Sequence, residues 1–140
     1  METPKEIIVI KNAKVIFADL EDKGYGRNIT IEVTDDIKTQ IEEWVKANNI
    51  NGGKAKFKTY KDEKSNTEMT RYTFKLSKFT QIESTVPASE GYGLRWGAII
   101  NLQARAFEYD NKFGKGISAS LSGVYVAEPA KNSMMENLKN

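Results

Sequence analysis

The residues whose types and spacing could do chemistry gather in one segment of the sequence, RWGAIINLQARAFEYD at positions 95–110. Its alternation is typical of a β-strand with one buried face, and it leaves Arg105, Phe107 and Tyr109 on the polar face. Exposed aromatic rings can stack on nucleobases, and a neighbouring arginine adds cation–π contact and neutralises phosphates. This face therefore favours a stacking surface for a single-stranded nucleic acid. The alternative is that Phe107 and Tyr109 close the end of a β-barrel or lie beneath a loop.

Catalysis has few candidate residues, because the 140-residue chain contains no histidine and no cysteine. These absences exclude a Ser-His-Asp triad, a cysteine nucleophile and the commonest zinc ligands. Carboxylate pairs remain, but they fall where a solvated helix end or turn is expected. A magnesium-dependent nuclease would need acids that converge from different strands, and the strand-borne candidates are Asp19, Glu32 and Glu108. We therefore expect a binding protein and not an enzyme, with no cofactor and no bound metal.

The charge distribution predicts an anionic partner. The net charge is only +2, yet residues 52–79 hold eight basic and three acidic residues, whereas residues 1–51 hold seven basic and ten acidic residues. In the alternating segments 54–61 and 69–79, the cations share one face of each predicted strand. Such a face would form an electrostatic track for a phosphate backbone, although a lysine-rich solvated strand has the same pattern. The cations of this track are Lys54, Lys56, Lys58, Arg71 and Lys75.

Two glycine-bearing loops supply further candidates. At the exit of a long loop predicted at 80–93 lie Tyr92, Arg95 and Trp96. Loops of more than about 12 residues in a compact domain are often functional or disordered. Trp96 is either a second stacking platform or a hydrophobic anchor, and the sequence leaves both interpretations open. In the first turn, Tyr25 and Arg27 either reach a nucleic acid or pack locally.

The remaining elements are predicted from hydrophobic periodicity. Helical spacing of apolar residues over 34–49 predicts an amphipathic helix that places Trp44 in the core. Strands are predicted at 7–20, 28–33, 54–61, 69–79, 95–110 and 117–127. Short antiparallel strands with one helix indicate a mainly β fold, and the best match is a small OB-fold-like antiparallel β-barrel with one α-helix. The helix follows the second strand, whereas the standard OB order places it after the third. A break near Asn12 that divides the first strand would remove this conflict.

The domain organisation is predicted to be one domain over residues 1–127 and a flexible tail over 128–140. MMENL at 134–138 could present a short apolar helix to a partner. No apolar run approaches the roughly 20 residues that span a bilayer, and the acidic start of the chain does not look like a signal peptide. We therefore expect a cytoplasmic protein that does not contact membranes.

Two stretches of the sequence carry a resemblance to a known family. RNITIEVTDD leads into the tryptophan-bearing helix, and GYGLRWGAIINLQARAFEYDNKFGKGISASLSGVYVAE covers the predicted last two strands. Over most of residues 10–128 the chain resembles phage single-stranded DNA-binding proteins of replication and recombination. The resemblance implies an OB-fold, a binding face instead of an active site, and no cofactor. Carried to matching positions, it implies DNA contacts by Arg105, Phe107, Tyr109, Lys112 and Lys115. Many such proteins end in an acidic tail, whereas residues 127–140 here have no net charge.

The function predicted from these observations is non-enzymatic coating and protection of single-stranded DNA in phage replication or recombination. The expected partner is single-stranded DNA, with replication or recombination proteins and a second copy of the chain as candidate partners. If the protein is phage-encoded, its compartment is the host cytoplasm. The alternative is a protein-interaction module, such as a phage adaptor or inhibitor, that uses the same aromatic face. Nothing in the sequence indicates how a 2′-hydroxyl would be treated, so RNA stays open.

Overall fold

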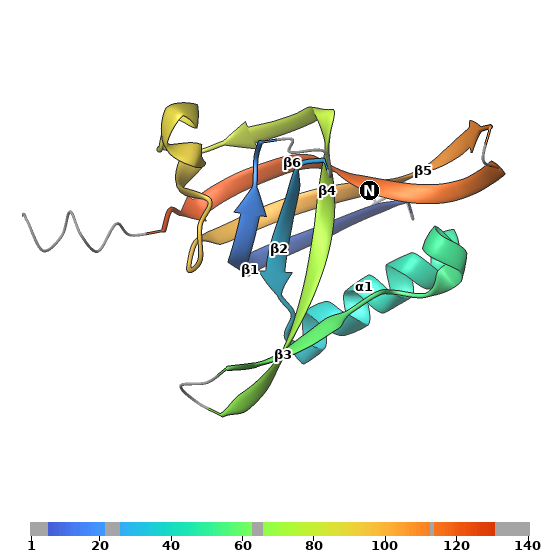
Figure 1. Ribbon diagram of the computed structural model, residues 1–140, viewed down its shortest axis with the longest axis horizontal. Coiled ribbons are helices and arrows are strands. Elements are labelled where there is room, and N and C mark those ends of the chain that lie inside the picture. The colour runs from blue at the N-terminus through green and yellow to red at the C-terminus, as the bar shows by residue number, and fades with distance from the viewer. Residues whose placement is uncertain (1–5, 22–25, 63–65, 113, 131–140) are drawn as a thin grey trace, which may run out of the picture.

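The computed structural model describes residues 6–21, 26–62, 66–112 and 114–130 (Figure 1). Tyr25 and the part of the predicted tail from residue 131 onwards, which includes 134–138, lie outside these ranges. The strands are β1 (Ile7–Asp19), β2 (Asn28–Glu32), β3 (Lys58–Asp62), β4 (Thr67–Glu83), β5 (Ile99–Asn111) and β6 (Gly114–Glu128). The helices are α1 (Asp35–Asn48) and the short 3₁₀ segments η1 (Ile50–Gly53) and η2 (Ala88–Gly93).

The strands form a closed ring. Their order is β2-β1-β5-β6-β4-β3, and an additional pairing of β2 with β4 joins the two ends of a five-strand circuit, from which β3 extends. Every pair is antiparallel except β4 with β6, which run parallel. The predicted mainly β, OB-like fold with one α-helix is confirmed, and the parallel pair is its one departure from a wholly antiparallel arrangement.

Strand β1 belongs to both sides of the ring because two irregularities change its direction. Its first half pairs with β5, and its second half pairs with β2. The first register shift, between Ile10 and Ala13, contains Asn12 in the left-handed region at φ 58°. The second shift lies between Val15 and Phe17. The predicted break near Asn12 is therefore a bulge within one strand, and the helix still follows the second strand.

Helix α1 forms where the periodicity predicts it. The Thr34 hydroxyl accepts a hydrogen bond from the Ile37 amide at 3.4 Å, and Asn49 ends the helix in the left-handed conformation at φ 53°. Trp44 is 5% exposed, donates its indole N–H to the Glu6 carbonyl at 3.1 Å, and lies 6.5 Å from Phe74 between ring centroids. The predicted core role of Trp44 is confirmed. Within the described chain, no helix has the length and apolar character required to cross a bilayer.

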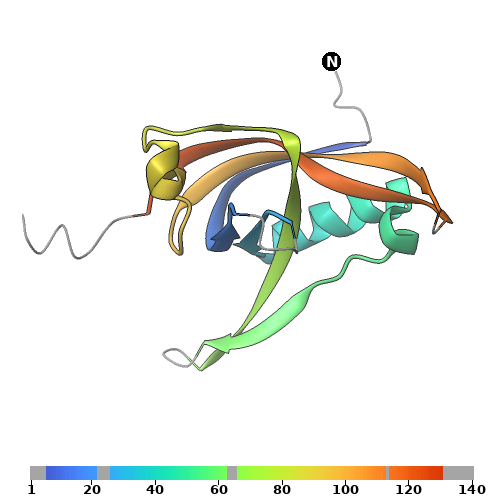
Figure 2. The ribbon, with the colours of Figure 1, turned by 45° about the horizontal axis from the view of Figure 1, so that its top comes forward.

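The bounds of β3 and β4 differ from the prediction. Strand β3 begins at Lys58, so Lys54 and Lys56 precede it. Strand β4 continues to Glu83 through residues predicted as loop, because Gln81–Glu83 pair with Gly123–Tyr125 of β6. This pairing joins segments about 40 residues apart and is invisible to local periodicity. Figures 1 and 2 show the β3–β4 and β5–β6 hairpins leaving the ring in different directions.

Candidate nucleic-acid interface

The polar face of β5 carries the three predicted stacking residues on the outside of the ring. Arg105, Phe107 and Tyr109 are exposed, and the alternating residues Ala104 and Ala106 are buried. Phe107 is 45% exposed and Tyr109 is 41% exposed. The alternative that the two rings lie wholly beneath a loop or inside the barrel end therefore does not hold. We call Arg105, Phe107 and Tyr109 the β5 strip.

Strand β6 offers only small residues opposite the β5 strip. Ser120, Ser118 and Gly116 pair with the three residues of the strip, in that order. The Tyr109 ring lies over Gly116, where an added Cβ would stand 2.6 Å from the Tyr109 Cζ. Glycine is therefore needed at position 116 for the ring to lie against the sheet. These small residues form a flat shelf beside the two rings of the β5 strip.

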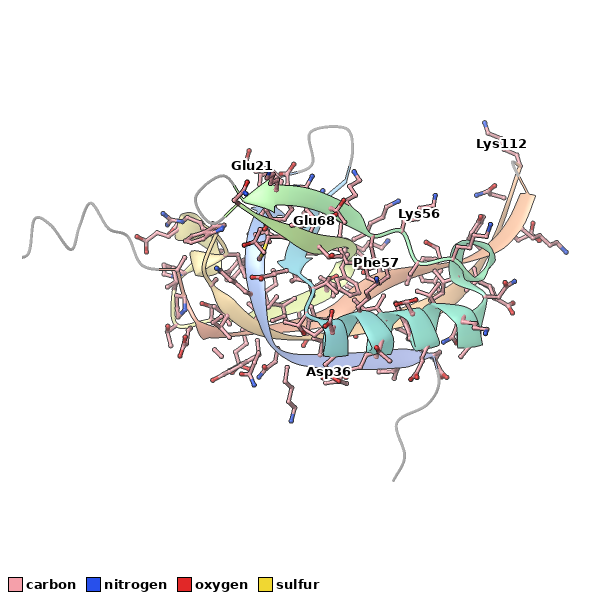
Figure 3. All side chains as sticks on the ribbon, turned by 90° about the horizontal axis from the view of Figure 1, so that it is seen from below. Glu21, Asp36, Lys56, Phe57, Glu68 and Lys112 are labelled. Carbon is pink, nitrogen blue, oxygen red and sulfur yellow. The ribbon has the colours of Figure 1, made fainter. Side chains whose placement is uncertain are left out.

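The two lysines implied by the resemblance lie at the tip of the β5–β6 hairpin. Lys115 stands 3.9 Å from Asp110 in an exposed ion pair, which contributes little to stability. Figure 3 shows Lys112 at this tip, beyond the C-terminal end of α1 and far from Glu21 and Glu68. Because Lys115 pairs with Asp110 and Gly116 pairs with Tyr109, the Lys115 side chain leaves the hairpin on the face opposite the β5 strip.

A second outer surface, on β1, β2, β4 and β3, carries cations and aromatic rings. Its residues form three rows in pairing register: Asp19–Asn28–Lys75, Phe17–Thr30–Thr73 and Glu32–Arg71–Lys58. Ile29, Ile31 and Phe74 alternate with these residues and point into the core, so the rows lie on the outer side of the sheet. Within the middle row, Thr73 is exposed, whereas Thr30 is only 5% exposed. The Thr30 and Thr73 hydroxyls are hydrogen-bonded at 2.8 Å in the middle row. We call this surface the basic face.

Two aromatic residues of the basic face were not predicted from the sequence. Phe17 is 56% exposed and points outward because the shift after Val15 reverses the alternation of β1. Tyr60 is half-buried, and the Arg71 guanidinium lies 5.5 Å from its ring centroid. In the alternating segment 54–61, Tyr60 comes two residues after Lys58. This alternation could have predicted that both side chains lie on the same face. No local pattern could have placed Phe17.

The cations of the basic face are only partly balanced, since its three rows hold three cations and two carboxylates. Lys58 and Arg71 are directly opposite across β3 and β4, an arrangement that destabilises a sheet unless an anion lies nearby. Glu32 opposes Arg71 from the other side, on β2. Arg71 and Lys75 are four residues apart on β4, about 13 Å in an extended strand, with Thr73 between them. Asp19 lies in the same row as Lys75, at the margin of the face.

Lys54 and Lys56 lie outside this set. Both are exposed on the extended segment that leads into β3. Figure 3 shows Lys56 beside Phe57, which lies between the β3–β4 hairpin and α1. The rings of Phe57 and Tyr72 are 5.4 Å apart, and burial raises the pKa of the Tyr72 phenol above its ordinary value of 10.0. One face of the alternating segment 54–61 thus packs against the core, and the other face is exposed to solvent.

The loop candidates separate into a packed residue and exposed ones. Tyr92 is half-buried against the core, and its carbonyl accepts a hydrogen bond from the Ser84 hydroxyl at 2.8 Å. Arg95 is exposed, and Trp96 is 66% exposed at the tip of a tight turn with Gly97 at φ 97°. The Lys14 ammonium lies 4.3 Å from the centroid of a Trp96 ring. Trp96 is therefore a surface residue, and its alternative role as a hydrophobic anchor does not hold.

The predicted site residues thus fall into two groups. Lys58, Arg71 and Lys75 come together on the basic face, whereas the β5 strip lies on the outside of the β1–β5–β6–β4 sheet. Across the described residues, no three acids gather in a group that could hold a metal ion. The strand-borne acids proposed for a nuclease therefore do not form a centre there.

The closed ring of strands with a parallel β4–β6 pair and one helix defines an OB-like fold with two candidate binding surfaces. Solved structures of the single-stranded DNA-binding protein from bacteriophage Enc34 have this fold. Its C-terminal truncation matches with a TM-score of 0.62 and 19% identity, covering 90% of this chain and 86% of that one. Its complex with single-stranded DNA matches with a TM-score of 0.62 and 17% identity, covering 90% and 88%.

These structural matches confirm, for the fold, the resemblance to phage single-stranded DNA-binding proteins. No protein-family model matches the chain, and no curated protein sequence matches it. At sequence identities below 20%, a structural similarity supports the fold alone. The roles of the site residues are therefore argued from their geometry in this structure.

Proposed function

We propose that this protein binds single-stranded DNA without catalysing a reaction, and that the basic face holds the strand. The observation that carries this proposal is the middle row, in which the exposed Phe17 ring stands beside a hydrogen-bonded threonine pair, between rows that carry Lys75 and Arg71. A base over the middle row would have a cation on each side for its phosphates. The DNA complex of the structurally similar Enc34 protein supports the same ligand class.

The energetics of the basic face suit a polyanion. Phosphates near Lys58 and Arg71 would relieve their mutual repulsion and release counterions, so affinity falls as salt rises. Phe17 and Tyr60 supply π faces that any base can use, which gives binding with little sequence preference. The arginine already over Tyr60 adds cation–π contact to a stacked base.

The β5 strip is proposed to hold a second segment of the same strand. Its rings stand beside a shelf of small residues, and its arginine and Lys112 at the hairpin tip provide cations for the backbone. Arg95 and Trp96 are proposed as further contacts, since both are exposed at one turn. Coating of single strands during phage replication or recombination in the host cytoplasm is the biological role that we propose.

The test is a fluorescence-anisotropy titration of a labelled oligothymidine of about 30 nucleotides against a duplex of equal length. We expect tight binding to the single strand that weakens steeply with salt, and much weaker binding to the duplex. An oligouridine of equal length measures the preference for DNA over RNA. Equal binding to single strand and duplex, or no binding to either, would contradict the proposal and favour the protein-interaction alternative.

A further inference from the structure

A sharp turn of β4 carries an aromatic ring that neither the basic face nor the β5 strip includes. Strand β4 pairs with β2 as far as Lys75, and it pairs with β6 at Leu76 and again from Gln81 onwards. Figures 1 and 2 show the turn of β4 between these two parts. Phe79 lies in the turn and is 76% exposed, the largest fraction for any large hydrophobic residue of the described chain. We call residues 77–80 the β4 corner.

Hydrogen bonds fix the backbone of the β4 corner. The Ser77 amide donates to the Thr80 hydroxyl at 2.8 Å, and the Phe79 amide donates to the Ser77 hydroxyl at 3.1 Å. The Thr80 hydroxyl donates to the Leu121 carbonyl of β6. The Arg27 guanidinium donates to the Ser77 carbonyl at 2.6 Å. The corner is thus fastened both to β6 and to the residue before β2. A ring held in water on a fixed backbone loses little freedom when a ligand stacks on it.

The β4 corner lies at a seam between the basic face and the β5 strip. Leu76 and Leu121 pair in parallel, and both pack into the core. The residues before them, Lys75 and Ser120, therefore lie on the outer side. Lys75 belongs to the basic face, and Ser120 pairs with Arg105 of the β5 strip. Strand β4 is two strand spacings from β5 here, or roughly 10 Å. A bound strand can thus pass from one surface to the other past the corner.

The charges around the β4 corner favour a phosphate backbone. The Lys78 ammonium lies 5.2 Å from the centroid of the Phe79 ring, and the Lys78 side chain is exposed. The Arg27 guanidinium reaches the corner through its hydrogen bond, and Asp19 offsets part of this charge from the margin of the basic face. A ring with cations beside it suits a base and its phosphates. A protein partner that buried the ring would also have to desolvate the ammonium beside it.

We propose that Phe79 stacks on a base of the segment that crosses from the basic face to the β5 strip, and that Lys78 contacts the adjoining phosphate. Arg27 is a positioning residue that holds the corner. This inference rests on the proposed function and deepens it, because one strand that crosses the corner makes the two surfaces a single continuous site. Once the basic face holds one segment, the next segment binds the corner as an intramolecular event. An oligonucleotide too short to leave the basic face gains nothing from the corner.

The first test measures how affinity depends on the length of the strand. The full chain is titrated at low salt with labelled oligothymidines of about 6 to about 16 nucleotides, within the site sizes of one OB fold. Phe79→Ala should bind the shortest strand within about twofold of the wild type. It should bind the longest strand roughly 5- to 150-fold more weakly, the loss expected of one stacked base. Phe17→Ala should weaken binding at every length, because its ring lies on the basic face that all strands use.

The matched control for the ring is Tyr125→Ser. Its ring is 50% exposed on the other sheet, and it pairs with Glu83, whose carboxylate disfavours a phosphate backbone. This variant should therefore bind as the wild type does at every length. Circular dichroism verifies that each variant is folded. Because most of the Phe79 ring is in water, its removal should leave the melting temperature nearly unchanged.

The second test uses charge and does not depend on the Phe79 variant. Lys78→Gln should lower the slope of log affinity against log salt by about 0.7 for the longest strand and leave the slope for the shortest strand unchanged. Lys46→Gln removes an exposed cation from α1 and should change neither slope.

The outcomes separate this inference from the proposed function. A wild type that binds single strands tightly while Phe79→Ala loses nothing at any length would overturn the crossing alone and leave the ring to a protein partner. Equal losses for short and long strands would place Phe79 within the first segment and would also overturn it. An unchanged salt slope in Lys78→Gln at every length would remove the phosphate from the corner. A wild type that binds no strand of any length would refute both proposals.

Discussion

Replacement of Phe17 by alanine tests the basic face most directly. The ring is 56% exposed and stands in the middle row, beside the Thr30–Thr73 hydrogen bond. A stacked ring contributes about 1–3 kcal/mol per base, so we expect the dissociation constant for oligothymidine to rise roughly 5- to 150-fold. Because more than half of the ring is already in water, the free energy of unfolding should fall by less than the roughly 3–5 kcal/mol of a fully buried phenylalanine.

The assay is the same anisotropy titration, carried out at several salt concentrations. Phe17 carries no charge, so the slope of log affinity against log salt should equal that of the wild type while the whole line moves to weaker binding. Tyr125→Ser is the matched control, since it removes a ring of similar exposure from the other sheet and should leave the affinity per chain unchanged. A change in affinity below about twofold, or about 0.4 kcal/mol, would refute the assignment of Phe17 to the stacking surface.

Four further outcomes are expected. Replacing the three cations of the basic face by glutamine should lower the salt slope by about 2, since each phosphate contact on a single strand contributes roughly 0.7; an unchanged slope would move the backbone elsewhere. Gly116→Ala should displace the Tyr109 ring and weaken DNA binding several-fold with little change in melting temperature, whereas unchanged affinity would remove that ring from the interface. Trp96→Phe should shift tryptophan emission to shorter wavelength, because only the buried Trp44 remains, and should abolish any emission change on DNA binding. Burial raises the pKa of Tyr72 above 10.0, so the unfolded chain releases that proton first and the free energy of unfolding falls as pH rises past this value. Tyr72→Phe should make this fall shallower in urea titrations at about pH 9 and about pH 11; an equal fall in both proteins would contradict it.

Local features of the sequence were sufficient for the elements that depend on local physics. The helix predicted at 34–49 is observed at Asp35–Asn48, because its cap and its apolar spacing are both contained in one short segment. The outward face of β5 was also predictable, since strict alternation over a long strand fixes which side chains share a face. The surplus of cations in 52–79 likewise follows from composition alone.

The outward orientation of Phe17 does not follow from the local sequence pattern. The buried residues of β1 are Ile8 and Ile10 before the first irregularity, and Ala13 and Val15 after it. Continued alternation from Val15 would bury Phe17. The second irregularity turns Phe17 outward, because β1 there pairs with β2 and no longer with β5. A bulge of this kind depends on which strand lies alongside, and one sequence segment does not contain that information.

The sequence by itself determined the class of this protein: a mainly β chain without histidine or cysteine, with a basic central segment and aromatic residues on a polar strand face. The tertiary structure decided which of these residues meet. Ring closure through β2 and β4 brings Phe17 beside residues more than 50 positions away, and it leaves the β5 strip on a different surface. The physical reason is that strand neighbours are chosen by long-range pairing and core packing, whereas periodicity reports only which side of its own strand a residue occupies.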